Sequence, residues 1–120
     1  MEDIFNIKKS LFKYNAEVIK VYDGDTITCN IDLGFGVFLK KQSIRLYGIN
    51  TPEVRGNEKA EGIKSRDYLR ELIFNKVIRL ETIKSSKKGK YGRWLGIIYL
   101  NDVNINKKLV DEKYAKIVIY

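Results

Sequence analysis

The chain has 120 residues and a mass of 14.0 kDa, which is enough for one compact domain with one modest hydrophobic core. Hydrophobic residues make up 44% and charged residues 32%, a composition that excludes a disordered or fibrous protein. There is no His and a single Cys, Cys29, which excludes a histidine base, a His or multi-Cys zinc site and an intrachain disulfide. Catalysis would therefore need carboxylates, Arg, Lys, Tyr or hydroxyl groups, and any metal would be a hard cation that prefers oxygen ligands.

The positive charge is concentrated in the second half of the chain. The formal net charge is +8; residues 1–60 hold nine basic and eight acidic side chains, and residues 61–120 hold fourteen and seven. Clustered cations gain free energy by releasing the counterions condensed on phosphates, so this asymmetry favours a polyanionic partner. The alternative is a basic surface that only keeps the protein in solution.

The chain lacks the patterns of a membrane span and of a secretion signal. No apolar run approaches the roughly 18 residues that a membrane span needs. The first residues, Met1-Glu2-Asp3-Ile4, are acidic where a signal peptide would be basic. We therefore expect no membrane partner and a cytoplasmic protein as the chain stands, with its compartment otherwise unknown.

Three strand patterns come before Pro52. Residues 16–22 and 26–33 are short β-prone runs, and the Asp23-Gly24 dipeptide between them favours a tight hairpin turn. Residues 34–36 hold two glycines and break the pattern, and residues 37–49 alternate again between apolar and polar side chains. Pro52 ends this third strand because proline cannot donate a hydrogen bond to a sheet.

The hydrophobic period changes after residue 57. Apolar side chains recur over residues 57–74 at the spacing of one helix face, which predicts one long helix. Residues 76–83 and 94–100 have the pattern of strands, and the loop between them is polar and basic. Asn106 is expected to cap a short helix that reaches about Lys113, and residues 115–120 are expected to be extended.

This order of elements predicts a mainly β (α+β) fold. Five short strands with two helices favour a five-stranded OB-fold-like β-barrel, because closing the sheet removes its exposed edges. An open α+β sandwich is the alternative. We expect residues 1–15 to form an N-terminal extension and residues 16–120 to form the barrel domain.

The first polar cluster is Asp23-Gly24-Asp25-Thr26, at the predicted hairpin tip. Two carboxylates within one small volume are a suitable start for a cation site with oxygen ligands. The alternative is a purely structural turn, since the aspartates of Asp-Gly turns often hydrogen-bond to the local backbone.

The second cluster lies at the end of the third predicted strand. Arg45 is on its polar face, and Asn50, Thr51 and Glu53 occupy a loop that Pro52 stiffens. Such a loop holds a carboxylate in place. The alternatives are a solvent-exposed loop acid for Glu53 and a surface ion-pair partner for Arg45.

The third cluster is the basic loop, residues 84–93. It holds five cations and Tyr91, on which a base or sugar can stack while Lys87, Lys88 and Lys90 contact the phosphate backbone. Arg93 directly precedes the apolar strand, so it is the cation of this loop whose position we expect to be fixed.

These three clusters, in this order, resemble the staphylococcal nuclease (thermonuclease) family. The matching segments cover about residues 16–117: Val21-Tyr22-Asp23-Gly24-Asp25-Thr26, Arg45-Leu46, Asn50-Thr51-Pro52-Glu53, Tyr91-Gly92-Arg93 and Val103-Asn104-Ile105-Asn106. The resemblance implies an OB-fold nuclease domain and a monomeric, Ca²⁺-dependent phosphodiesterase. Its partners would be DNA and/or RNA, single-stranded or frayed, cut with low sequence specificity.

The resemblance also implies a metal site. Asp25 would be the main carboxylate ligand, Asn50 would fill the second ligand position, and the main-chain carbonyl of Thr51 would be the third. Asp23 and Thr26 would hold these ligands in position without binding the metal themselves. The family typically has Asp at the position of Asn50, so this site would lose one negative charge, and calcium affinity falls with ligand charge.

The remaining implied roles concern the substrate. Glu53 would orient or deprotonate the attacking water, and the family mechanism leaves open which. Arg45 and Arg93 would hold the phosphate and stabilise the charge that builds on it. Tyr91 and Lys90 would contact the neighbouring phosphate or nucleotide. Two alternatives are a catalytically weak or inactive OB-type module that binds single strands and a protein-interaction barrel, although the latter leaves both arginines unexplained.

Overall fold

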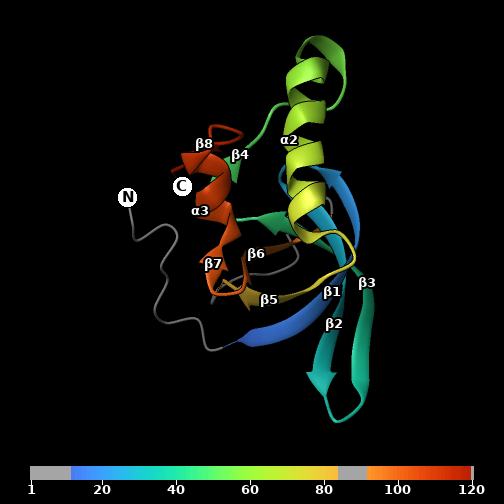
Figure 1. The fold of residues 1–120 in the computed structure, drawn as a ribbon. Helices are drawn as coiled ribbons and strands as arrows, with labels where there is room; N and C mark the ends of the chain where they lie inside the picture. The colour runs from blue at the N-terminus through green and yellow to red at the C-terminus, as the bar shows by residue number, and fades with distance from the viewer. Residues whose placement is uncertain (1–11, 84–91, 120) are drawn as a thin grey trace.

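A computed structural model describes residues 12–83 and 92–119 and shows a closed β-barrel (Figure 1). Its long strands are β1 (Lys13–Asp23), β2 (Thr26–Gly34), β3 (Val37–Leu46), β5 (Val77–Thr82) and β6 (Trp94–Leu100). They are hydrogen-bonded in the order β3-β2-β1-β5-β6, and a parallel pairing between β3 and β6 closes the barrel. The predicted five-stranded OB-fold-like barrel is therefore confirmed, and the open sandwich is wrong.

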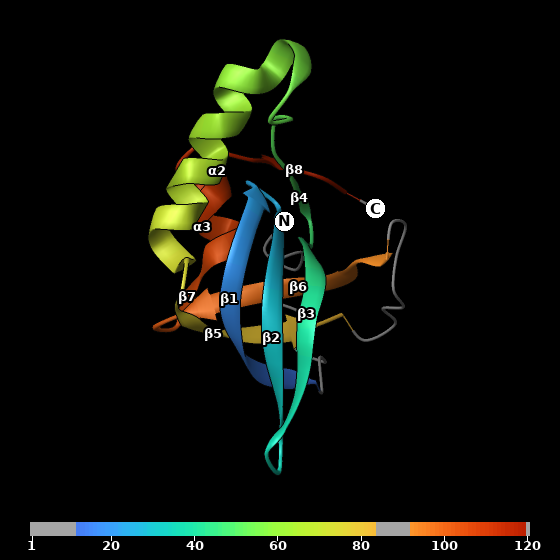
Figure 2. The same cartoon turned by 90° about the vertical axis from the view of Figure 1, so that its right-hand side faces the viewer.

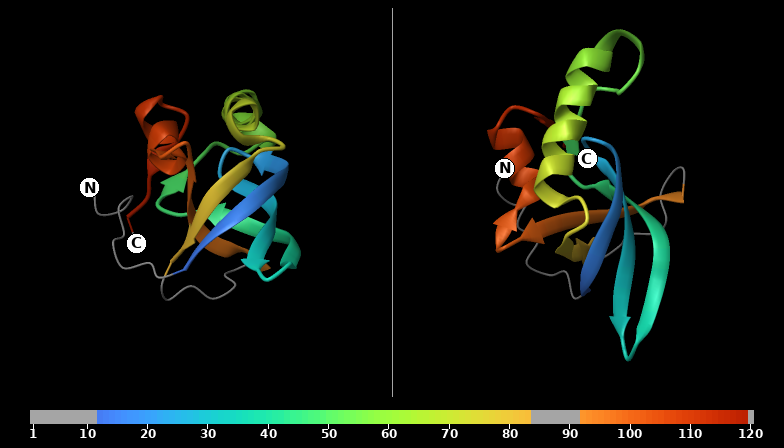
Figure 3. Two further views of the ribbon diagram at one scale, coloured as in Figure 1. Left: turned by 60° about the horizontal axis from the view of Figure 1, so that its bottom comes forward. Right: turned by 45° about the vertical axis from the view of Figure 1, so that its right-hand side comes forward.

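The helices cover one side of this barrel (Figure 3). The chain enters α2 (Lys59–Ile73) from β4 (Ile49–Asn50) through a 3₁₀ turn, η1 (Gly56–Glu58), and α2 packs against β1. After β6 come β7 (Val103–Asn104), α3 (Ile105–Asp111), which packs against β6, and β8 (Lys116–Ile117), which pairs antiparallel with β4. Both predicted helices are present. None of the helices within residues 12–83 and 92–119 is long and apolar enough to cross a bilayer.

Side chains alternate along the strands between the inside and the outside of the barrel, and those that face inward form the core. The buried apolar side chains of β1 and β2 meet those of α2 and α3 inside and above the barrel. The largest are Ile27, Ile44, Leu46, Ile49, Leu69, Ile73, Ile78, Leu80, Ile97, Ile98, Ile105 and Leu109. Cys29 belongs to this core, and burial raises the pKa of its thiol to about 12.

The cap of α3 differs from the prediction. Asn104, not Asn106, caps the helix, because its side chain accepts a hydrogen bond from the backbone N–H of Lys107 at 3.0 Å. Asn106 is fully buried instead. Its Nδ2 donates to the carbonyls of Tyr47 (2.9 Å) and Gly96 (3.2 Å), and its Oδ1 accepts from the N–H of Ile98 at 3.1 Å. Asn106 therefore joins the end of β3 to β6.

Two strand boundaries also differ. β1 begins at Lys13, three residues before the predicted start, and the carbonyl of Phe12 already accepts from Thr82 N–H at 3.1 Å. β3 ends at Leu46, because the chain turns at Gly48, which has a φ of +81°. The division into a 1–15 extension and a 16–120 domain stays a prediction.

Helix α2 passes very close to the loop after β4. A Cβ atom at Gly62 would overlap the carbonyl oxygen of Glu53, so only glycine fits there. This contact fixes the backbone that carries Glu53.

The close contact at Gly62 predicts that Gly62→Ala destabilises the protein, although the same substitution usually stabilises a helix. In a free helix surface, Gly→Ala stabilises by about 1 kcal/mol. Here we expect Gly62→Ala to lower the free energy of unfolding by roughly 1–3 kcal/mol, because the added methyl group forces the loop away. Urea denaturation measures this. Glu61→Ala, at the exposed neighbouring position, is the control and should change stability by less than about 0.5 kcal/mol; a stabilised Gly62→Ala would contradict the close packing.

Candidate active site

Three parts of the chain meet at one end of β2. They are the turn between β1 and β2, the segment from the end of β3 through β4 to Thr51, and Arg93, the residue before β6. The turn residues are Gly24 and Asp25, one position later than predicted. Gly24 is required for close approach rather than for its φ angle, since a Cβ there would lie 2.7 Å from Cγ2 of Thr51 and 2.9 Å from Cβ of Ser65.

Asp25 is the buried centre of the site, with 5% of its surface exposed. Its Oδ2 accepts from the backbone N–H of Thr51 at 2.9 Å, and its Oδ1 accepts from the hydroxyl of Thr26 at 3.2 Å. The Nη1 atom of Arg45 lies 3.4 Å from the same Oδ2. A buried carboxylate is stable only with such partners, so its orientation is fixed.

Arg45 connects Asp25 to Asn50. Its Nη1 donates to the carbonyls of Leu46 (2.9 Å) and Ile49 (3.0 Å), and its Nη2 donates to Oδ1 of Asn50 at 3.2 Å. These bonds fold the guanidinium across the Tyr47–Gly48 turn. Arg45 is thus both a charge at the site and a support for the backbone around it.

Arg93 approaches from the other side. Its Nη1 donates to the hydroxyl of Thr26 at 3.2 Å, and Thr26 pairs with Arg45 across β2 and β3. Two guanidinium groups therefore flank the Asp25–Thr26 segment, as an anion site requires.

The structure does not bring every predicted residue into this cluster. Glu53 is exposed; its backbone N–H donates to the Glu58 carboxylate at 3.1 Å, and within residues 12–83 and 92–119 no hydrogen bond or ion pair joins its carboxylate to Asp25 or either arginine. Lys87, Lys88, Lys90 and Tyr91 lie outside the described residues. Their predicted contacts stay predictions.

The oxygen atoms of the cluster suit a hard cation. The donors that the sequence predicts are the Asp25 carboxylate, the Asn50 amide oxygen and the Thr51 carbonyl. Asp25 and Thr51 are joined by a hydrogen bond, and the buried Thr51 hydroxyl oxygen has no hydrogen-bond partner. Within residues 12–83 and 92–119, no three His, Cys, Asp or Glu side chains gather closely enough to hold a metal. A cation at this site would therefore depend on amide and main-chain oxygens.

Asp23 lies directly beside Asp25. Its Oδ1 accepts from the backbone N–H of Asp25 at 3.0 Å. Burial, and then repulsion by the Asp25 carboxylate, raise the pKa of Asp23 from its ordinary value of 3.8 to about 7. The metal-free site thus carries less negative charge near neutral pH than its two aspartates indicate.

One side of the site could not be predicted from local sequence patterns. A cavity of about 180 Å³ adjoins it, lined by Asn50 and Thr51 on one side and by residues 113–116 on the other. Lys113 and Lys116 reach this position because β8 pairs with β4, Asn50 lying opposite Lys116. No local pattern in residues 113–116 could have predicted this short pairing.

The comparisons with known proteins identify a family. Residues 43–120 match the family model described as staphylococcal nuclease homologue. Over 107 residues the chain is 35% identical to a thermonuclease of Staphylococcus hyicus, covering 87% of this chain and 59% of that protein. A thermonuclease of Staphylococcus intermedius is 33% identical (86% of this chain, 59% of that protein), and a Haemophilus influenzae protein named as an uncharacterized endonuclease is 36% identical (86% and 52%).

The closed five-stranded barrel with two helices is an OB-type fold. The chain belongs to the staphylococcal nuclease homologue family, as the sequence motifs predicted. It spans between half and three-fifths of the length of these three relatives.

The pKa of Asp23 predicts how stability depends on pH without metal. Below about pH 4 Asp23 is protonated in both states; as the pH rises to about 7 the unfolded state releases this proton first, so stability falls. Asp23→Asn keeps the hydrogen-bond acceptor but cannot ionise, so it removes this loss of stability with rising pH. In chelator we expect the variant to be more stable than the wild type by on the order of 1 kcal/mol at about pH 8, after allowance for solvent screening, and no more stable at about pH 4. Thermal unfolding at both pH values measures this, and an equal difference at both would contradict it.

Proposed function

We propose that this protein is a Ca²⁺-dependent nuclease that hydrolyses phosphodiester bonds of DNA and/or RNA with low sequence specificity. Single-stranded or frayed segments are the proposed substrates, and the monomer is the proposed active form. The observation that carries the proposal is the cluster of Asp25, Thr26, Arg45 and Arg93, joined by bonds of 3.2–3.4 Å at one end of the barrel. Membership of the nuclease family supports it.

The two arginines address the main obstacle to this reaction. A phosphodiester is anionic and repels a nucleophile, so the catalyst must neutralise it before and during attack. A guanidinium presents a planar set of N–H donors that fits two phosphate oxygens, and it stays charged at any working pH. Arg45 and Arg93 flank Thr26, so both can reach one phosphate placed over that residue.

Asp25, Asn50 and the carbonyl of Thr51 are the residues that would hold the calcium ion. When bound, calcium would supply positive charge to the phosphate and lower the pKa of a nearby water. Thr26 donates a hydrogen bond to the Asp25 carboxylate and Asp23 accepts one from the Asp25 backbone N–H, so both hold Asp25 in place. Glu53 would orient the attacking water or accept its proton, and its exposed position leaves the carboxylate free to meet substrate.

The basic loop would bind the strand on either side of the scissile bond. Lys87, Lys88 and Lys90 would contact phosphates, and Tyr91 would stack on a base or sugar. Because phosphate contacts carry no sequence information, these roles agree with low specificity.

One observation favours a weaker competing function, a module that binds single strands without cutting them. Asn50 contributes no charge, and its amide oxygen already accepts from Arg45 at 3.2 Å. If the remaining charge of Asp25 is too small to hold calcium, the arginines would still bind phosphate.

The test of the proposed function is cleavage of single-stranded DNA and RNA by the purified chain in calcium and in chelator. We expect degradation only with calcium. Arg93→Ala should reduce turnover about a hundredfold or more, the usual cost of removing one group that stabilises the transition state. Arg66→Ala, an arginine on α2 that pairs with Asp67, is the matched control and should keep wild-type activity. Strand binding without any cleavage would favour the binding module, and unchanged activity in Arg93→Ala would show that the site is placed wrongly.

The departure at Asn50 gives a second test of the metal site. One added charge a few ångströms from a divalent ion is worth about 1 kcal/mol or more even when well screened. We therefore expect Asn50→Asp to bind calcium on the order of ten times more tightly, and the wild type to need millimolar calcium. Calorimetric titration compares the two proteins, and equal affinities would exclude residue 50 from a metal site.

A further inference from the structure

The hairpin between β2 and β3 ends in an apolar tip, residues 33–39. It extends beyond the body of the barrel, at the end of β2 that is opposite to the candidate active site (Figures 1 and 2). Its apolar side chains are exposed, and Phe35 is 105% exposed at the turn. The others are Leu33, Val37, Phe38 and Leu39, between 39% and 53% exposed.

Folding of the hairpin does not explain Phe35. Gly34, Phe35 and Gly36 have φ angles of +82°, +56° and +75°, so Phe35 and Gly36 occupy the central positions of a two-residue hairpin turn with positive φ. Asn or Gly is favoured at the position of Phe35, and a bulky side chain there is uncommon. The side chain is fully exposed, so it adds nothing to the core. A phenylalanine that costs stability and contacts nothing in the barrel needs another reason.

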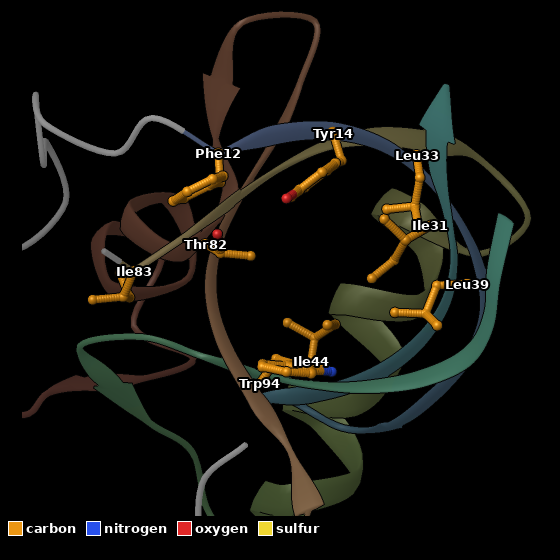
Figure 4. A pocket seen from close by; sticks show the side chains of 9 residues that line it. All are labelled: Phe12, Tyr14, Ile31, Leu33, Leu39, Ile44, Thr82, Ile83 and Trp94. Carbon is orange, nitrogen blue, oxygen red and sulfur yellow. The ribbon is translucent and has the colours of Figure 1, made fainter. Parts of the chain in front are cut away.

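The tip continues into an apolar cavity at the adjoining mouth of the barrel. The cavity has a volume of about 270 Å³, and Leu33 and Leu39 form part of its wall (Figure 4). Other walls come from Phe12, Tyr14, Ile31, Ile44, Ile83 and Trp94. The exposed hairpin and this mouth therefore form one apolar surface rather than scattered side chains.

Two lysines, Lys40 and Lys41, directly follow the tip in β3. The register passes from Ile31↔Leu39 to Cys29↔Gln42, so Lys40 and Lys41 form a bulge opposite Asn30 alone. The backbone N–H of Lys41 donates to Oδ1 of Asn30 at 3.0 Å, and both lysines are exposed. Asp32, the acid of this hairpin, has its Oδ1 bonded to Gly34 N–H at 2.8 Å.

We propose that the hairpin tip inserts into the surface of an anionic lipid bilayer. Phe35 and Phe38 enter the boundary between headgroups and acyl chains, while Lys40 and Lys41 bind the negative headgroups. The proposal does not depend on the proposed nuclease function. It departs from the expectation of no membrane partner, which was based on the absence of a spanning segment.

The observations favour lipid over other partners. Aliphatic side chains outnumber aromatic ones at the tip, whereas strand binding relies on stacking on aromatic rings. An anionic surface complements both lysines and the net charge of +8. Because the candidate active site is at the other end of β2, a chain bound by its tip keeps that site open to solution.

The test is co-sedimentation with vesicles of phosphatidylcholine, with and without phosphatidylglycerol. We expect binding to the anionic vesicles, at least tenfold weaker for Phe35→Asn/Phe38→Ser because two apolar anchors are lost. Lys40→Gln/Lys41→Gln should weaken binding about fivefold per lysine and reduce its salt dependence. Phe74→Asn removes an exposed phenylalanine at the end of α2, and this matched control should bind as the wild type does.

The single variant Phe35→Asn distinguishes two causes of weaker vesicle binding, loss of the apolar anchor and misfolding of the protein. Asparagine suits this turn, so its melting temperature should stay the same or rise while vesicle binding falls. The proposal is overturned if the wild type does not sediment with anionic vesicles or if the tip variants bind as well as it does. It is also overturned if the tip variants lose dimerisation or single-strand binding in the absence of vesicles while vesicle binding is unchanged.

Discussion

The buried carboxylate of Asp25 holds together the end of the barrel that carries the candidate active site. It accepts from the backbone of Thr51, twenty-six positions later in the chain, and from the hydroxyl of its neighbour Thr26. Arg45 balances its charge. Removing either partner would leave a buried charge or an unpaired donor, so the β1–β2 turn, the end of β3 and the loop after β4 are stabilised as one unit. The residues proposed for chemistry are therefore also residues that hold the fold.

The closure of the sheet depends on a second polar residue. Parallel pairing of β3 with β6 covers only three residue pairs, from Ile44↔Trp94 to Leu46↔Gly96. Asn106 bonds to Tyr47 just beyond β3 and to Gly96 and Ile98 in β6, which extends this seam with side-chain hydrogen bonds. α3 is thus attached where the barrel closes, and the position of Arg93 just before β6 depends on the same seam.

Features with a local cause could be predicted from the sequence. Alternation at residues 26–33 and helical spacing at residues 57–74 are set by which side chains face the core, so β2 and α2 were found. The cap of α3 could not be chosen in this way, since Asn104 and Asn106 both suit a cap and only the tertiary contacts of Asn106 decide between them. The motif also could not show that Arg45 bonds to the Leu46 and Ile49 carbonyls, because those bonds require the turn at Gly48. The exposure of Phe35 could not be predicted either, because it lies in the break at residues 34–36, and such a break does not indicate whether a side chain is buried or exposed.

The burial of Cys29 has a practical and chemical consequence. Nucleophilic attack, metal capture and oxidation by peroxide all proceed through the thiolate. The pKa of about 12 leaves very little thiolate at neutral pH, and the sulfur lies inside the barrel wall. We therefore expect Cys29 to react slowly with oxidants and alkylating reagents in the folded protein. A thiol introduced at any exposed position would be the single reactive one, so a spectroscopic label could be attached there without altering the native residue.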